Sequence, residues 1–190
     1  MGAGVLIHRF DTKDYHRLID AGVLHEDDRV ELIEGRIVDM TPIGTRHSAC
    51  VNRLNTIFAQ KLQGQSIVSI QNPIQLAEQS EPEPDIVLLK YLEDFYSDEL
   101  PESEDVLLLI EVADSSLDYD RNTKIPLYAK AGILEVWLVD LLENCIEIYM
   151  SPYAEGYETK RLIRNEQSVS PQKFPDINLT ANQILGIKTS

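Results

Sequence analysis

Two aliphatic runs that each meet a carboxylate limit the fold of this chain more than any other feature of its sequence. Val106–Ile110 ends at Glu111, and Ile86–Leu89 begins directly after Asp85. Short, continuous apolar runs bounded by turn signals are typical of strands buried in a sheet. Because a buried carboxylate is costly unless it is paired or binds a cation, these two acids on adjacent strands would form an oxygen-rich site suited to a hard divalent metal.

Apolar periodicity along the rest of the chain predicts one α/β domain spanning residues 1–190, built on a mixed β-sheet flanked by helices. Helical spacing and capping residues predict helices at residues 13–21, 46–62, 118–131 and 180–185. Alternation and turn residues predict strands at residues 29–33, 36–40, 67–76, 85–89, 105–113, 135–140, 146–150 and 159–163. The first two and the last two strands are expected to form added N-terminal and C-terminal hairpins, and Pro126 predicts a bend or a late start in the third helix.

Composition is typical of a globular protein, and we expect a cytoplasmic one. Hydrophobic residues make up 43% of the sequence, and no apolar run reaches the roughly 20 residues that span a bilayer. The start of the chain, Met1–Arg9, lacks the basic start and the long apolar core of a signal peptide. Cys50 and Cys145 lie far apart without the spacing of a zinc site or a redox pair, so we expect free thiols in a reducing compartment.

The strand-end acids admit two interpretations from their position alone. If the two strands pair, the side chains of Asp85 and Glu111 converge within reach of one metal ion, and the carbonyl oxygen of Val112 can supply a third ligand. Mg²⁺ at such a site would keep several waters, and one of these could become a nucleophile. In the simpler interpretation both carboxylates are solvated at the rim of the sheet.

A second group of polar residues lies on the predicted third helix. Asp120, Lys124 and Tyr128 are spaced four apart and therefore share one helix face. A lysine beside a metal site could hold an attacking water or stabilise charge on a phosphoryl group. The simpler interpretation is a surface pair between Asp120 and Lys124, worth only about 0.3–0.5 kcal/mol.

Taken together, these segments resemble the Uma-two-type endonucleases of the restriction-endonuclease-like fold, within the PD-(D/E)XK nuclease superfamily. The matching segments, in chain order, are residues 31–35, 84–86, 110–116, 120–128 and 132–140. The resemblance extends from about residue 10 to residue 185. It implies a restriction-endonuclease-like mixed sheet and a phosphodiesterase site that uses Mg²⁺, or Mn²⁺ in its place, to cleave DNA.

The resemblance also implies roles for individual residues. Asp85 and Glu111 become metal ligands together with the Val112 carbonyl. The superfamily lysine should follow Glu111 by two residues, but Ala113 occupies that position. The resemblance places the functional lysine on the following helix, at Lys124, whose long side chain can reach the same point from a different part of the backbone.

An accessory acid and a histidine complete the implied site. Glu31 resembles the extra acidic residue that many such nucleases bring to the metal, and Glu34, in the adjoining turn, competes for this role. His47 lies at the start of the long helix, where the family tends to have histidine, and could contact phosphate, orient a water or cap the helix. Ser115 and Ser116 follow the Glu111 strand without an indicated base, so we interpret them as a helix-entry turn rather than as nucleophiles.

The leading hypothesis is therefore a Mg²⁺-dependent DNA endonuclease with Glu31, Asp85, Glu111 and Lys124 as its catalytic residues. A net charge of −15 argues against non-specific affinity for a polyanion, and it favours the alternative of a non-catalytic, degenerate binding module with the nuclease fold. A hydrolase for a small phosphoester is a third hypothesis. By fold analogy we expect a homodimer, and we expect no membrane association.

Overall fold

The computed structural model describes residues 7–25 and 27–188. The first six residues, on which the signal-peptide argument depends in part, lie outside this range. The helices are α1 (Thr12–Asp20), α2 (Thr45–Leu62), η1 (Ser103–Asp105), α3 (Leu117–Tyr119), η2 (Asp120–Lys124), α4 (Ile125–Lys130) and α5 (Ala181–Leu185). The strands are β1 (Val30–Ile33), β2 (Arg36–Asp39), β3 (Ser66–Ile70), β4 (Ile86–Lys90), β5 (Val106–Ala113), β6 (Glu135–Asp140), β7 (Cys145–Tyr153), β8 (Gly156–Ile163), β9 (Ser168–Val169) and β10 (Leu179–Thr180).

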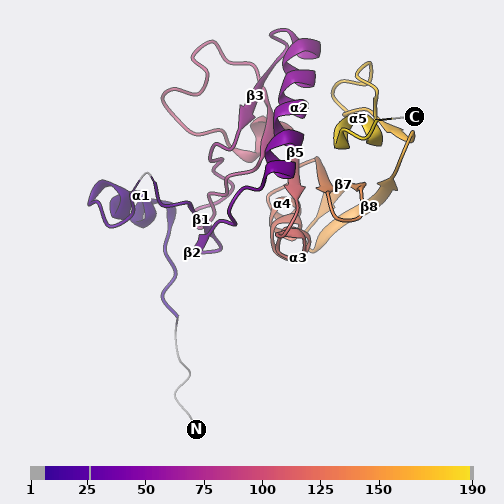
Figure 1. Cartoon of the computed structure of the whole chain (residues 1–190). Helices are drawn as coiled ribbons and strands as arrows, with labels where there is room; N and C mark the ends of the chain where they lie inside the picture. The colour runs from indigo at the N-terminus through magenta and orange to yellow at the C-terminus, as the bar shows by residue number, and fades with distance from the viewer. Residues whose placement is uncertain (1–6, 26, 189–190) are drawn as a thin grey trace.

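A six-stranded mixed sheet with helices against it forms the centre of the molecule, as the sequence predicted (Figure 1). Its strand order is β3-β4-β5-β6-β7-β8, and only β5 and β6 run parallel. The chain crosses from β5 to β6 through α3, η2 and α4, because a parallel pair requires a crossover connection. The β1–β2 hairpin is separate from this sheet, whereas the predicted C-terminal hairpin, β7–β8, forms one end of it. The extension of one domain over residues 1–190 stays a prediction.

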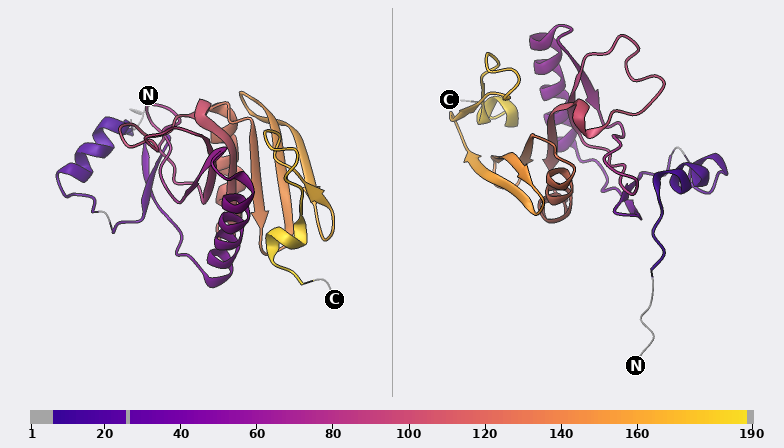
Figure 2. Two further views of the ribbon diagram at one scale, coloured as in Figure 1. Left: turned by 90° about the horizontal axis from the view of Figure 1, so that it is seen from above. Right: turned by 180° about the vertical axis from the view of Figure 1, so that it is seen from behind.

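Alternation along the strands divides the core into two layers. Leu108, Ile110 and Val112 of β5 pack with α2 and α5, which lie on the same side of the sheet (Figure 2). Leu109 and Ala113 belong to the opposite layer, which includes α4. Glu111 lies between these last two residues in the alternation and therefore points toward the crossover helices.

Several predicted boundaries are confirmed by the structure. Asp11 caps α1 through its side chain, and Thr180 caps α5 in a capping box with Gln183. Glu34 and Gly35 connect β1 and β2 with φ values of 48° and 75°, the left-handed pair that a two-residue hairpin turn requires. Both cysteines are buried and free, as expected.

The strand predicted at residues 67–76 is too long. β3 ends at Ile70, and Gln71 then adopts a φ of 51°, which takes the chain out of the sheet. Pro73 has no N–H to donate to a sheet ladder, so pairing does not resume immediately after the turn. The alternation of apolar residues continues to Ile74 because this side chain is buried, although the segment is not part of a strand.

The helix predicted at residues 118–131 is confirmed, because α3, η2 and α4 follow one another without a gap from Leu117 to Lys130, but it contains a π turn that was not predicted. The η2 segment is a π-helical turn, in which the Ile125 N–H donates to the carbonyl oxygen of Asp120. Pro126 is the second residue of α4, just after the π turn, and it has no N–H to donate to the helix. The helix does not start late at Pro126, as one interpretation of the sequence had it, and the π turn before the proline has no sequence signal of its own.

Among the described residues, no helix combines the length and the apolar character that a membrane crossing would need.

Candidate functional site

A cleft of about 480 Å³ opens where β4 begins and β5 ends. Its lining includes all of the residues that the sequence predicted as catalytic or metal-binding, namely Glu31, Asp85, Glu111, Val112 and Lys124. They come from four places in the fold: Glu31 from β1, Asp85 from the residue before β4, Glu111 and Val112 from β5, and Lys124 from the end of η2. The antiparallel register that pairs Ile86 with Ile110 brings Asp85 beside Glu111.

Asp85 and Glu111 are locked together by main-chain hydrogen bonds. The Asp85 N–H donates to Oε2 of Glu111 at 3.3 Å, and the Val112 N–H donates to Oδ2 of Asp85 at 2.8 Å. Glu111 is only 2% exposed, so it is not a solvated rim carboxylate. In an extended strand the N–H and C=O of one residue point to the same side, and the Val112 carbonyl therefore faces the same edge as its N–H.

Lys124 contacts two acids that come from different strands, Glu31 and Glu111. Its Nζ lies 3.0 Å from Oε2 of Glu31 and 3.3 Å from Oε1 of Glu111. All three side chains are less than a tenth exposed, so the surface-pair interpretation of Lys124 does not hold. Asp120 is buried as well, and its Oδ2 accepts a hydrogen bond from the Ser116 hydroxyl at 2.6 Å.

Burial and the neighbouring charges shift the pKa values of the groups in this cluster. Burial raises the pKa of Glu111 to about 8, although Lys124 acts to lower it. Burial alone would lower the pKa of Lys124, but Glu111, Glu31 and Asp120 together raise it above its ordinary value. The lysine therefore stays charged, and a further cation near Glu111 would favour its ionised form.

Of the two candidate accessory acids, only Glu31 belongs to the cluster. Besides Lys124, its Oε2 accepts a hydrogen bond from the Glu83 N–H at 3.2 Å. Glu34 lies in the β1–β2 turn, more than half exposed, and pairs with Lys130 at 3.8 Å. Glu34 is also absent from the described residues that line the cleft.

Three further side chains hold the acids in place. His47 Nε2 lies 3.0 Å from Oδ1 of Asp85, and the same oxygen accepts a hydrogen bond from Gln71 Nε2 at 3.2 Å. Tyr128 is fully buried and its hydroxyl donates to Oε1 of Glu111. The sequence indicated Tyr128 through its four-residue spacing from Lys124, and it indicated His47 through its position at the start of the long helix. Gln71 had none, since it follows a strand in an irregular turn.

The donor set is small. In the part of the chain that the structure describes, no group of three or more His, Cys, Asp or Glu side chains is arranged to hold a metal ion. Two carboxylates and a main-chain carbonyl are nevertheless all oxygen donors, the kind that Mg²⁺ and Mn²⁺ prefer, and Mg²⁺ usually keeps several waters beside one or two carboxylates. The residues present therefore fit a partly hydrated ion of this class.

Comparisons with known proteins also point to a nuclease-like protein. The model of the Uma2 family, described as "Putative restriction endonuclease", matches residues 12–182. The crystal structure of "a putative nuclease belonging to DUF820" from Anabaena variabilis ATCC 29413 is similar with a TM-score of 0.73 and 16% identity, over 93% of this chain and 98% of that one. At this identity the likeness establishes the fold. No curated protein matches the chain.

Proposed function

Because the chain belongs to the Uma2 family, whose model covers residues 12–182, we propose that it is a metal-dependent phosphodiesterase that cleaves DNA internally. The observation that carries this proposal is the convergence of Asp85 and Glu111 in one cleft, with Lys124 Nζ 3.3 Å from Glu111. Acid pairs joined to an ammonium group in this way are suited to in-line displacement at phosphorus. The proposed substrate follows from the family description.

Asp85, Glu111 and the Val112 carbonyl are the proposed ligands of Mg²⁺, with Mn²⁺ as its substitute. When bound, the ion would polarise a phosphoryl oxygen and lower the pKa of water. The protein contributes the alignment of the two carboxylates, which the Val112 N–H and His47 fix on Asp85 and which Tyr128 fixes on Glu111.

Lys124 and Glu31 have a different proposed task. A charged ammonium group beside the acids can offset the charge that develops on the phosphoryl oxygens. Glu31 also contacts this group, at 3.0 Å, so we assign it the positioning of Lys124. Ala113 is fully buried at the position where the superfamily has its lysine, and Lys124 therefore provides the cation within contact of Glu111.

The principal test is cleavage of plasmid DNA with Mg²⁺, with Mn²⁺ and with a chelator. We expect cleavage that needs the divalent ion and that disappears in Glu111→Ala, with circular dichroism unchanged. The matched control is Glu34→Ala, which removes an exposed acid of the neighbouring turn and should cleave like the wild type. Activity that persists in Glu111→Ala would exclude this site as its source.

A second candidate function, a binding module without turnover, is favoured by the net charge of −15. Calorimetric titration separates the two candidates: Mg²⁺ or Mn²⁺ binding that is lost in Asp85→Ala supports the enzyme, and a folded protein without any response supports the module. Plasmid, single-stranded DNA, RNA and a chromogenic phosphodiester, tested side by side, distinguish a nuclease from a hydrolase of small phosphoesters. Light scattering would test the homodimer that we predict by fold analogy.

A further inference from the structure

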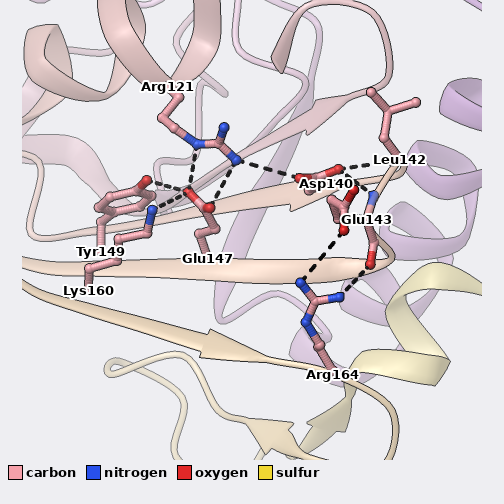
Figure 3. Close-up of polar contacts among 8 residues, drawn as sticks. All are labelled: Arg121, Asp140, Leu142, Glu143, Glu147, Tyr149, Lys160 and Arg164. Atoms are coloured by element: carbon pink, nitrogen blue, oxygen red, sulfur yellow. Dashed lines mark hydrogen bonds and ion pairs between the residues drawn. The ribbon is translucent and has the colours of Figure 1, made fainter. Parts of the chain in front are cut away.

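A second cluster of charged residues gathers around Arg121 of η2 (Figure 3), and among the described residues Arg121, Glu147 and Lys160 are not part of the cleft lining. Its centre is Glu147 on β7, a buried carboxylate that accepts hydrogen bonds from Arg121 Nε at 3.3 Å and from Arg121 Nη2 at 3.0 Å. Lys160 Nζ on β8 lies 2.9 Å from the same carboxylate, and the Tyr149 hydroxyl donates to it. The guanidinium thus holds Glu147 with two donors, in the fixed geometry that arginine provides and lysine does not.

Arg121 is also tied to the end of β6. Its Nη2 lies 3.5 Å from Oδ2 of Asp140, which is only 1% exposed. The other oxygen of Asp140 accepts hydrogen bonds from the main-chain N–H groups of Leu142 and Glu143, each at 2.9 Å. The arginine therefore binds two carboxylates that are themselves fixed on neighbouring strands of the sheet.

The sequence position of Arg121 makes this attachment informative. It belongs to the π-helical turn Asp120–Lys124, whose first and last residues line the cleft. Arg121 lies between them and, among the described residues, is not part of that lining. The turn is thus held on one side by Arg121 against β6 and β7, and on the other by Lys124 against Glu31 and Glu111.

A π turn is rarely stable by itself, and such turns occur often at functional sites. Changing it to a regular α-helix would rotate every residue after it relative to the sheet, because a π turn holds one residue more than an α turn. Lys124 is the last residue of this turn, so the position of its ammonium group depends on what keeps the turn in place.

The geometry points to the Arg121–Glu147 pair as a positioning device that sets the place of the Lys124 ammonium group in the cleft. This inference rests on the proposed function insofar as it concerns catalysis, but the position of Lys124 can be measured without any activity. A pair that only stabilised the fold would act on the free energy of unfolding, and the place of Lys124 in the folded molecule would not change.

The test compares Arg121→Gln, Arg121→Lys and Glu147→Gln with the control Lys160→Met. The control also removes a cation that contacts Glu147, but from β8 instead of η2. Each folded variant is examined in two ways: by single-turnover cleavage of DNA over a range of concentrations, and by ¹³C NMR of the Lys124 side chain, whose signal is assigned by its loss in Lys124→Arg.

We expect Arg121→Gln and Glu147→Gln to reduce the maximal single-turnover rate constant by about 10–100-fold, with little change in the concentration that gives half of it, as for residues that orient a catalytic group. The Lys124 signal should shift or broaden in both. Arg121→Lys, which keeps the charge but loses the two-donor geometry, should recover only part of the rate. Lys160→Met should retain both the rate and the signal, even if its stability falls.

Two results would overturn the inference. One is an unchanged Lys124 signal in folded Glu147→Gln or in folded Arg121→Gln. The other is an equal loss of signal and rate in Lys160→Met, because the effect would then be general. If the wild type cleaves no DNA, the proposed function fails, and the NMR comparison still decides whether Arg121 positions Lys124.

Discussion

Lys124 Nζ lies 3.3 Å from Oε1 of Glu111, although the residue two positions after Glu111 is the buried Ala113. The lysine comes from the crossover helices and not from the strand that holds the acid. The cluster therefore joins an ammonium group from the crossover helices to a carboxylate on β5.

Lys124→Met should be strongly destabilising as well as inactive. Glu31, Glu111 and Asp120 are all buried around this lysine, so its removal leaves buried acids without the cation that contacts them. Breaking a buried charge pair from one side typically costs about 3–5 kcal/mol. Urea denaturation at neutral pH measures this loss.

The matched control for this variant is Lys130→Met. Lys130 is 70% exposed and pairs with Glu34 across 3.8 Å, so its removal should change the free energy of unfolding by no more than about 0.5 kcal/mol. Equal losses in the two variants would mean that the charge cluster around Lys124 is already compensated by water.

The strands and acids of the site could be predicted because their signals are local. An aliphatic run bounded by turns indicates a buried strand whatever follows, and pairing β4 with β5 then brings Asp85 to Glu111. The burial of Lys124 could not be read in this way, since four-residue spacing fits a surface pair equally well. It depends on the contact with Glu31, which comes from a separate hairpin far along the chain.

The π turn and its anchor had no local signal either. Asp120–Lys124 contains ordinary helix-compatible residues, and only Pro126 indicated an irregularity nearby. The contacts that hold the turn involve Glu147 and Asp140 on later strands. Tertiary contacts of this kind can override local propensity, which is why the sequence predicted the crossover helix but not the π turn within it.

Glu111→Gln should separate activity from stability. Burial raises the pKa of Glu111 to about 8, so the ionised form is costly to bury and a neutral amide of the same shape avoids that cost. We expect the free energy of unfolding to change by less than about 1 kcal/mol, while metal-dependent cleavage falls by at least about 100-fold.

Thermal unfolding and cleavage assays on the same preparation of Glu111→Gln provide the two measurements. A folded variant that retains full cleavage would remove Glu111 from the proposed metal ligands. The control Glu143→Gln, an exposed acid of the β6–β7 turn, should leave both quantities as in the wild type.

His47→Ala should weaken metal binding without unfolding the protein. His47 Nε2 lies 3.0 Å from Oδ1 of Asp85 and thus helps to fix the direction of this carboxylate. Loss of a residue that orients a metal ligand typically lowers affinity by about 10–100-fold. Calorimetric titration with Mn²⁺ measures the change.

His16→Ala is the control for this measurement, because His16 also pairs with a carboxylate, Glu81, at 2.8 Å but lies outside the cleft lining. Mn²⁺ affinity should be unchanged in this variant. If His47→Ala binds Mn²⁺ as tightly as the wild type, then Gln71 and the Val112 N–H are sufficient to hold Asp85.

The Glu147 cluster should make stability depend on pH in a direction that can be worked out. Burial acts to raise the pKa of Glu147, but hydrogen bonds from Tyr149, Arg121 and Lys160 outweigh it and lower the pKa below its ordinary value of 4.5. Asp140 is the other acid near Arg121. A carboxyl group whose pKa is lower in the folded state stabilises the protein above its unfolded pKa, and this contribution disappears as the pH falls through the folded pKa.

The free energy of unfolding of the wild type should therefore exceed that of Glu147→Gln most clearly at neutral pH. The difference should begin to shrink as the pH falls below about 4.5, the range in which the unfolded chain takes up this proton first. Urea denaturation of both proteins between about pH 3.5 and 7 measures it. A difference that grows on acidification would mean that Glu147 is held as a neutral acid, and Arg121 would then lack the charged partner on which its anchoring of η2 depends.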